Sequence, residues 1–247
     1  MSTDRDWQAW GERDPYYGVL SHERFRRARL TPHALEEFFQ LGREEVHEVI
    51  SECSRHVGDV TLSRTLDFGC GVGRLLIPLS ELSDQCVGVD VSAAMRAEAV
   101  RNCEKFQRHN VRLAGSLGEL GDARFTFVHS YIVLQHIDPR RGLGIIADLL
   151  GRLDERGAAA LHVTYGRSKY AANLGVQQLG RRIFRGVRRP LSRLARRLRN
   201  RDPEMQMNAY DINRVLFVAQ RAGVRSGGFR FTDHGGHLGL IFYFKRE

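Results

Sequence analysis

The stretch Leu66-Asp67-Phe68-Gly69-Cys70-Gly71-Val72-Gly73 decides the fold of this chain. Three alternating glycines follow an apolar run, and seventeen residues beyond Gly73 a second run, Val87-Gly88-Val89, closes on Asp90. A strand, a glycine-rich turn and an acidic residue ending the next strand are typical of a nucleoside-binding site in an open parallel sheet. The glycines permit a sharp turn and close approach of a ligand. Asp90 is placed to accept hydrogen bonds from both hydroxyls of a ribose.

The spacing separates two classes of ligand. A dinucleotide fingerprint reads G-x-G-x-x-G, and its helix N-terminus holds a pyrophosphate. Here Gly69 and Gly71 are followed by Gly73 and then Arg74, so that pattern is broken. A carboxylate at Asp67 would repel a pyrophosphate but suits a ligand with an ammonium group. The loop therefore favours a cationic nucleoside, and an NAD-dependent oxidoreductase is a lesser alternative.

Two motifs, "LDFGCGVGR" and "VGVDVS", resemble the first and second motifs of the class I S-adenosylmethionine-dependent methyltransferases. The resemblance implies S-adenosyl-L-methionine as cofactor and a small molecule as methyl acceptor. It places Asp90 at the ribose and the methionine part of the cofactor beside Asp67, Gly69, Cys70, Gly71 and Gly73. It also implies residues near the adenine, namely Val91, Ser92, Met95, Ser116 and Leu117, and residues beside the transferring methyl group, namely Ser130 and Tyr131.

Alternating strand-like and helical runs predict an α/β fold, Rossmann-like, with a mostly parallel seven-stranded sheet. Apolar runs predict parallel strands at 65–68, 85–90, 111–114, 125–130 and 158–164. Helical patterns lie between them, near 73–83, 93–107 and 140–153. The resemblance implies that the last helix, at 211–222, precedes an antiparallel C-terminal hairpin with strands at 224–231 and 238–245.

Two regions lie outside this unit. Residues 1–58 are expected to form an N-terminal helical cap, with a helix at 32–53 that packs across the edge of the sheet and covers the cofactor; an ordinary packing helix is the alternative. The order "DPYY…EEFFQLGREEV" in this region is similar to that of small bacterial methyltransferases acting on sugars and other small metabolites. Residues 59–247 are expected to form the methyltransferase domain, with a basic amphipathic insertion at about 167–205.

The positive charge of the chain is concentrated in this insertion. The chain carries a formal charge of +9, and residues 181–201 contain ten arginines and no acidic residue, so the remainder carries −1. This distribution disfavours a general nucleic-acid surface. At helical spacing the arginines lie opposite a stripe of apolar residues, which suits peripheral contact with an anionic membrane, a lid or acceptor binding. The alternative is that the apolar face packs on the protein and the arginines are solvated.

Composition indicates an enzyme of the cytoplasm. With 247 residues and 42% hydrophobic content the chain can bury a full core. It has no apolar run near the ~20 residues that span a bilayer, and its start is not that of a signal peptide. Four scattered cysteines, Cys53, Cys70, Cys86 and Cys103, disfavour a zinc site or a disulfide framework. Neither a metal site nor an oligomeric state is indicated.

Transfer of a methyl group to a hydroxyl often requires a base at the carboxyl ends of the strands. His136 is the first candidate, with His234 or His237 in reserve, although His136 in a turn can also serve only to fix its loop. The alternation of side chains along a strand predicts that His129 and His162 point into the helix-covered faces of the sheet as hydrogen-bonded core residues. An acceptor more acidic than an alcohol needs no base.

The function expected is therefore methylation of a small molecule at oxygen, with a sugar or glycolipid intermediate as acceptor. The alternative is a non-catalytic module of the same fold that docks onto a membrane or nucleic acid through the basic helix.

Overall fold

The protein is built on one seven-stranded sheet with the strand order β3-β2-β1-β4-β5-β7-β6. The computed structural model describes residues 2–168 and 202–247, so the basic segment 181–201 and most of the insertion 167–205 lie outside the described residues. Five strands run parallel: β1 (Arg64–Phe68), β2 (Gln85–Val89), β3 (Val111–Ala114), β4 (Phe125–Ser130) and β5 (Leu153–Arg167). The strands β6 (Val224–Asp233) and β7 (His237–Arg246) form an antiparallel hairpin, and β7 pairs with β5. The predicted sheet is confirmed.

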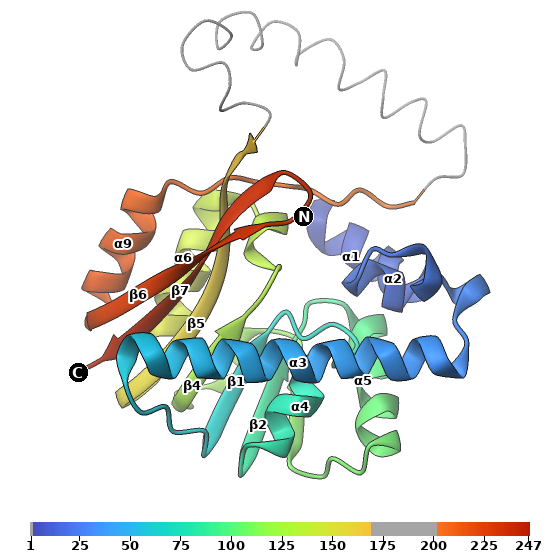
Figure 1. Cartoon of the computed structure of the whole chain (residues 1–247), viewed down its shortest axis with the longest axis horizontal. Coiled ribbons are helices and arrows are strands. Elements are labelled where there is room, and N and C mark those ends of the chain that lie inside the picture. The colour runs from blue at the N-terminus through green and yellow to red at the C-terminus, as the bar shows by residue number, and fades with distance from the viewer. Residues whose placement is uncertain (1, 169–201) are drawn as a thin grey trace, which may run out of the picture.

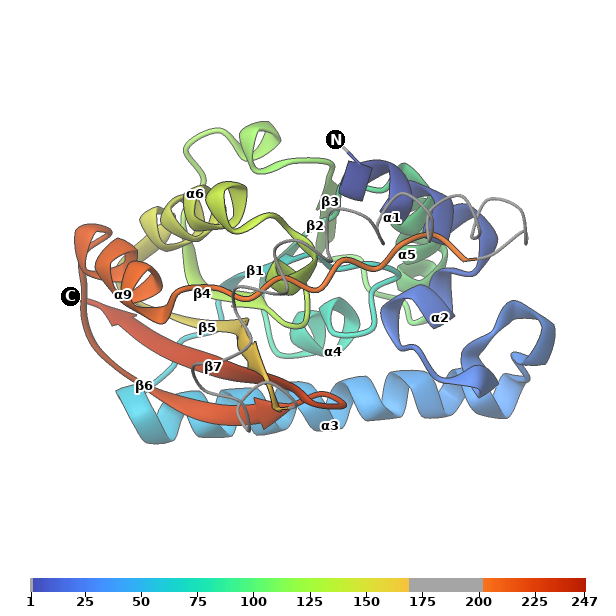
Figure 2. The same ribbon diagram turned by 90° about the horizontal axis from the view of Figure 1, so that it is seen from above.

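Helices cover both faces of this sheet (Figure 1, Figure 2). Strand residues alternate between the two faces, and they contribute to two separate cores. Phe127, Ala160 and Tyr243 pack with the helices α3 (Pro32–Val57), α4 (Leu76–Glu81) and α5 (Ala93–Lys105). The opposite face packs with α6 (Pro139–Gly151) and α9 (Ile212–Arg221).

Local sequence explains where these helices begin. Thr31, Ser92, Asp138 and Asp211 each accept a hydrogen bond from a backbone N–H in the first turn of α3, α5, α6 and α9 respectively. Proline follows Thr31 and Asp138 at a position where its missing N–H costs nothing. The helix expected at 73–83 spans only 76–81, because positive φ angles at Gly71 and Gly73 keep the preceding residues in a loop.

The long helix near the N-terminus lies elsewhere than expected. It was predicted to pack across the edge of the sheet, but α3 runs across a face of the sheet, where it contacts β5, β6, β7 and α4 (Figure 1). The reason is its apolar stripe, since Phe38, Val46 and Cys53 are fully enclosed in the core that they share with the strands. That α3 covers the cofactor stays a prediction.

Two shorter helices precede α3 within the expected cap region, residues 1–58. They are α1 (Ser2–Arg13) and α2 (Pro15–Val19), and neither was predicted as a helix from the sequence. They pack on α5, and a hydrogen bond of 2.6 Å from the Tyr16 hydroxyl to Glu98 fixes α2 there. The division of the chain at residue 58 stays a prediction, because the N-terminal residues share one core with the sheet.

Among the described residues, no helix is both long and apolar enough to cross a membrane. The four cysteines are all buried and unpaired. Burial raises the pKa of Cys53 to about 12 and that of Cys103 to about 11. Both thiols are therefore protonated packing groups at neutral pH.

Candidate functional site

The glycine loop connects β1 to α4 at the carboxyl edge of the parallel strands. Gly69, Gly71 and Gly73 all have positive φ angles, a conformation that other residues rarely adopt. A Cβ at Gly69 would lie 2.3 Å from Val133, and one at Gly71 would lie 2.7 Å from Val19 of α2. The sequence indicated glycines for the approach of a ligand; the structure shows that the turn and contacts with the protein already require them.

Asp90 is held beside this loop by backbone donors. The N–H of Gly71 donates to Oδ2 of Asp90 at 2.9 Å, and the N–H of Ser92 donates to Oδ1 at 2.8 Å. The two bonds fix the plane of the carboxylate, and each oxygen retains a lone pair for a further donor. Burial raises the pKa of the Asp90 carboxyl to about 6. This oriented, half-buried acceptor fits the two hydroxyls of a ribose.

The residues expected around the adenine occupy different environments. Val91 is 45% exposed, so its side chain is open to a ligand. Ser92 is fully buried and caps α5, and Met95 is buried close to Gly18 of α2. Ser116 is exposed and donates to Glu119 at 3.3 Å, while Leu117 is buried. Their roles stay predictions. Val91 and Ser116 are the two whose side chains are exposed and therefore open to contact with the adenine.

Sequence reasoning missed the contribution of α1 to this region. Gln8 accepts a hydrogen bond from the Ser92 hydroxyl at 3.1 Å, and Gly11 sits so close to α5 that a Cβ would lie 2.7 Å from the same hydroxyl oxygen. Arg96, also missed, donates to the carbonyl oxygen of Asp90 at 2.5 Å. Trp7 and Trp10 lie three residues apart, and this spacing is a signal from which an amphipathic helix could have been predicted here.

Asp67 lies one layer below the loop. It is 2% exposed, and its Oδ1 accepts a hydrogen bond of 2.8 Å from Nδ1 of His129, the residue that it faces across β1 and β4. Cys70 directs its side chain into the core, so only its backbone can serve a ligand. Ser130 donates to the carbonyl of Phe68 at 3.0 Å and ties the ends of β1 and β4 together. The expected ammonium contact of Asp67 stays a prediction.

Three rings lie together where β4, β5 and the β6–β7 turn end. The ring centroids of Tyr131, His162 and His234 are 5.1 to 5.8 Å apart. His162 is fully buried, with Nε2 2.9 Å from the Thr232 hydroxyl, and burial lowers its pKa to about 3. His129 and His162 are thus hydrogen-bonded core residues, as predicted. Burial also lowers the pKa of His234, whose Nε2 is enclosed without a hydrogen-bond partner among the described residues.

His136 lies in the turn that follows β4. Its Nδ1 donates to the carbonyl oxygen of Gln206 at 2.7 Å, and its ring meets that of Trp7 edge to face at 5.0 Å. Burial lowers the pKa of His136, so the ring is neutral at pH 7 and Nε2 keeps its lone pair. Nε2 lies 3.5 Å from the side-chain nitrogen of Gln135, which faces its lone pair. The bond to Gln206 fixes the tautomer and makes Nε2 the basic nitrogen of this buried ring.

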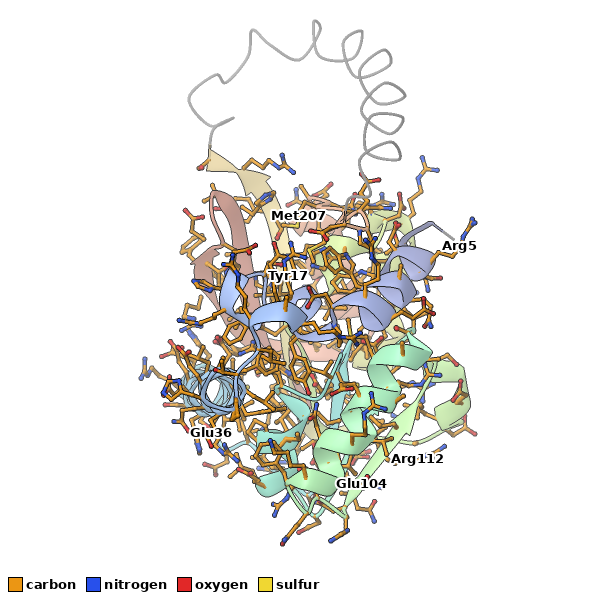
Figure 3. All side chains as sticks on the ribbon, turned by 90° about the vertical axis from the view of Figure 1, so that its right-hand side faces the viewer. Arg5, Tyr17, Glu36, Glu104, Arg112 and Met207 are labelled. Atoms are coloured by element: carbon orange, nitrogen blue, oxygen red, sulfur yellow. The ribbon has the colours of Figure 1, made fainter. Side chains whose placement is uncertain are left out.

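Residues 202–210 pass over this edge of the sheet (Figure 2). The N–H of Asn208 donates to the carbonyl of Gln135, and that of Tyr210 donates to Thr164, at 2.7 and 2.8 Å. In Figure 3 the labelled Met207 and Tyr17 of α2 lie at one end of the molecule, and Glu104 and Arg112 mark the other. Because the carbonyl oxygen of Gln206 also accepts from His136, the segment lies over the turn that follows β4.

The comparisons with known proteins agree with this geometry. A family model described as a methyltransferase domain matches residues 21–203. No curated protein matches the sequence. Similar solved structures include magnesium protoporphyrin IX methyltransferase from Synechocystis PCC 6803 with bound S-adenosylhomocysteine, at 19% identity over 95% of this chain and 98% of that one, with a TM-score of 0.58.

Two further solved structures are similar over most of the chain. The N-methyltransferase NodS from Bradyrhizobium japonicum WM9, also with S-adenosylhomocysteine, is 14% identical over 94% of this chain and 99% of that one, with a TM-score of 0.52. An O-methyltransferase family protein from Burkholderia thailandensis is 15% identical over 98% of this chain and 68% of that one, with a TM-score of 0.56. Because these structures differ in acceptor and in the atom methylated, they establish the fold and leave the acceptor open.

Proposed function

We propose, from the premise that this chain belongs to the family of S-adenosylmethionine-dependent methyltransferases, that it methylates a small molecule at oxygen. S-adenosylmethionine is the cofactor, and when bound it supplies a methyl group activated by a sulfonium. The observation that carries the proposal of oxygen as acceptor atom is the neutral ring of His136, whose Nδ1 is committed to Gln206 while Nε2 keeps its lone pair. A hydroxyl must lose a proton during methylation, and Nε2 is available to take it.

The cofactor-binding residues proposed are those that the loop and Asp90 organise. Asp90 accepts the ribose hydroxyls, Val91 packs on the adenine, and Tyr131 offers a ring face to the sulfonium. Burial, then the neighbouring carboxylate of Glu45, raises the pKa of Tyr131, so its phenol stays neutral at physiological pH. A neutral Tyr131 contributes its ring without adding a negative charge to the site.

The acceptor proposed is a sugar, a glycolipid intermediate or a similar hydroxyl-bearing metabolite. The rings of Tyr131 and His234, which are both partly exposed and meet edge to face, support this class, because apolar faces of a sugar pack on rings while its hydroxyls need polar partners. In the step proposed, the acceptor oxygen bonds to the methyl carbon as the carbon–sulfur bond breaks, and its proton passes to Nε2 of His136. His234 is the second candidate base, since its Nε2 has no hydrogen-bond partner among the described residues.

Titration calorimetry with S-adenosylmethionine, S-adenosylhomocysteine and NAD tests the first part of the proposal. We expect binding of the first two at micromolar concentration and none of NAD. A folded protein that binds neither donor nor product would favour the alternative of a non-catalytic module. Once an acceptor is found, His136→Gln should lower kcat by about 100-fold or more with little change in donor affinity, and His234→Gln serves as the comparison. If only His234→Gln is slow, the base is His234.

We also propose peripheral contact of the segment 181–201 with anionic membranes. Its ten arginines without an acidic residue support this, since each basic residue near an anionic surface contributes about 1 kcal/mol. Sedimentation with vesicles containing phosphatidylserine, at low and high salt, compares the wild type with a variant in which five of these arginines are glutamine. Wild-type protein that stays in the supernatant at low salt rules the contact out.

A further inference from the structure

Arg74 directly follows the last glycine of the binding loop and is almost completely buried. Only 6% of its surface is exposed. Helix α3 presses on it, because a Cβ at Gly42 would lie 2.3 Å from the carbonyl oxygen of Arg74 and 3.1 Å from its Cγ. A long cationic side chain is therefore confined between α3 and the loop.

No hydrogen bond or ion pair within the described part of the chain satisfies this guanidinium, and its Nε is completely enclosed. Burial lowers the pKa of the Arg74 guanidinium, which remains charged at physiological pH. Arg152 shows the usual arrangement, since its guanidinium is bonded to Asp148 and to backbone carbonyls including that of Leu117. Buried charges are normally paired, so an unpaired one indicates a missing anion.

Two acidic side chains near Arg74 have other partners. Asp67 and Glu45 both attract the guanidinium electrostatically. However, Asp67 accepts from His129 at 2.8 Å, and Glu45 lies 3.9 Å from Arg230. Neither of them is in hydrogen-bonding contact with Arg74. A planar anion close to the loop would complete the arrangement, because the guanidinium presents two parallel N–H donors.

We propose that Arg74 binds the α-carboxylate of the methionine part of the cofactor. The inference rests on the proposed function, and charge complementarity supports it: an amino acid carries an ammonium and a carboxylate on one carbon, and the loop has Asp67 at its start and Arg74 at its end. A carboxylate between α3 and the loop gives the buried guanidinium its partner. Arg74 then favours the cofactor with its complete methionine part over a nucleoside that lacks the carboxylate.

Decarboxylated S-adenosylmethionine tests this assignment, because it differs from the cofactor only in lacking that carboxylate. Dissociation constants for both ligands are measured by calorimetry with wild type, Arg74→Met, Arg74→Lys and the control Arg43→Met, which removes an arginine of α3 paired with Glu81. We expect Arg74→Met to raise the dissociation constant of S-adenosylmethionine by about 10- to 100-fold. The dissociation constant of the decarboxylated ligand should rise by less than twofold. Arg43→Met should leave both unchanged.

Each other result overturns the assignment in a distinguishable way. Equal weakening of both ligands makes Arg74 a packing residue of the loop and leaves the methyltransferase proposal intact. Unchanged cofactor affinity with a raised KM for the acceptor means that the missing anion belongs to the acceptor. If the wild type binds neither ligand, the proposed function fails as well. Melting curves check that the variants fold. If Arg74→Met does not fold, Arg74→Lys is used for the test, because lysine keeps the positive charge but lacks the two parallel N–H donors of the guanidinium.

Discussion

Replacing Asp90 with alanine should weaken binding of S-adenosylhomocysteine strongly. The carboxylate is already oriented by the N–H groups of Gly71 and Ser92, so both ribose hydroxyls can donate to it without rearrangement. A hydrogen bond to a charged group contributes about 1.5–3 kcal/mol. The two hydrogen bonds from the ribose are lost together in the variant, but water partly replaces them. We expect a loss of about 2–3 kcal/mol, which is roughly a 30- to 150-fold increase in Kd.

The same residue should make the affinity dependent on pH. The pKa of Asp90 is raised to about 6, and the hydroxyls bind the ionised form, so affinity falls as the pH falls through this value. At pH 5 about a tenth of the protein carries the carboxylate, and Kd should be about tenfold higher than at pH 7.5. Asp90→Asn, which cannot ionise, should show a nearly flat profile over this range.

Calorimetry at pH 5.0, 6.0 and 7.5 with wild type, both Asp90 variants and the control Asp84→Asn provides the measurement. Asp84 is an exposed residue just before the start of β2, so its replacement should change neither Kd nor its pH profile. A Kd for Asp90→Ala within twofold of the wild-type value would refute the reasoning and mean that the ribose binds elsewhere. If Kd of Asp90→Asn depends on pH in the same way as Kd of the wild type, the titrating group is not Asp90.

Three substitutions should alter stability, each measured by urea denaturation. Gly42→Ala should destabilise the protein by about 1–3 kcal/mol, because its Cβ would overlap the carbonyl oxygen of Arg74, whereas Gly144→Ala, with open space around it in α6, should be neutral or stabilising. Tyr210→Phe should lower the free energy of unfolding by about 1–3 kcal/mol, since its hydroxyl donates to two backbone carbonyls at 2.8 and 3.2 Å. Ser92→Ala should cost about 1 kcal/mol through the lost cap of α5, and an unchanged urea midpoint would show that the cap contributes nothing.

Much of the sheet could be predicted because its signals are local. Each buried parallel strand is a short apolar run, and the turn after β1 requires glycines at positions with positive φ. Aspartate or serine marks the start of α5, α6 and α9. The strand bounds were correspondingly close, except that β5 extends from 153 to 167 where 158–164 was predicted. Its added ends are held by pairing with Phe125 at one end and β7 at the other, which no local pattern reveals.

The sequence by itself determined the glycine loop and the position of Asp90 after the next strand, because those residues follow one another along the chain at a spacing typical of a strand–turn–helix unit. The resemblance of the same two motifs to a known family implied the cofactor. Only the tertiary structure decided which groups are satisfied. It paired His129 with Asp67, enclosed His162 beside Thr232, and left Arg74 without a hydrogen-bond or ion-pair partner among the described residues. Such pairings join residues far apart in sequence, since the Asp67–His129 contact spans 62 positions. Burial and pairing depend on which strands become neighbours, and that is settled by packing of the whole chain rather than by any one segment.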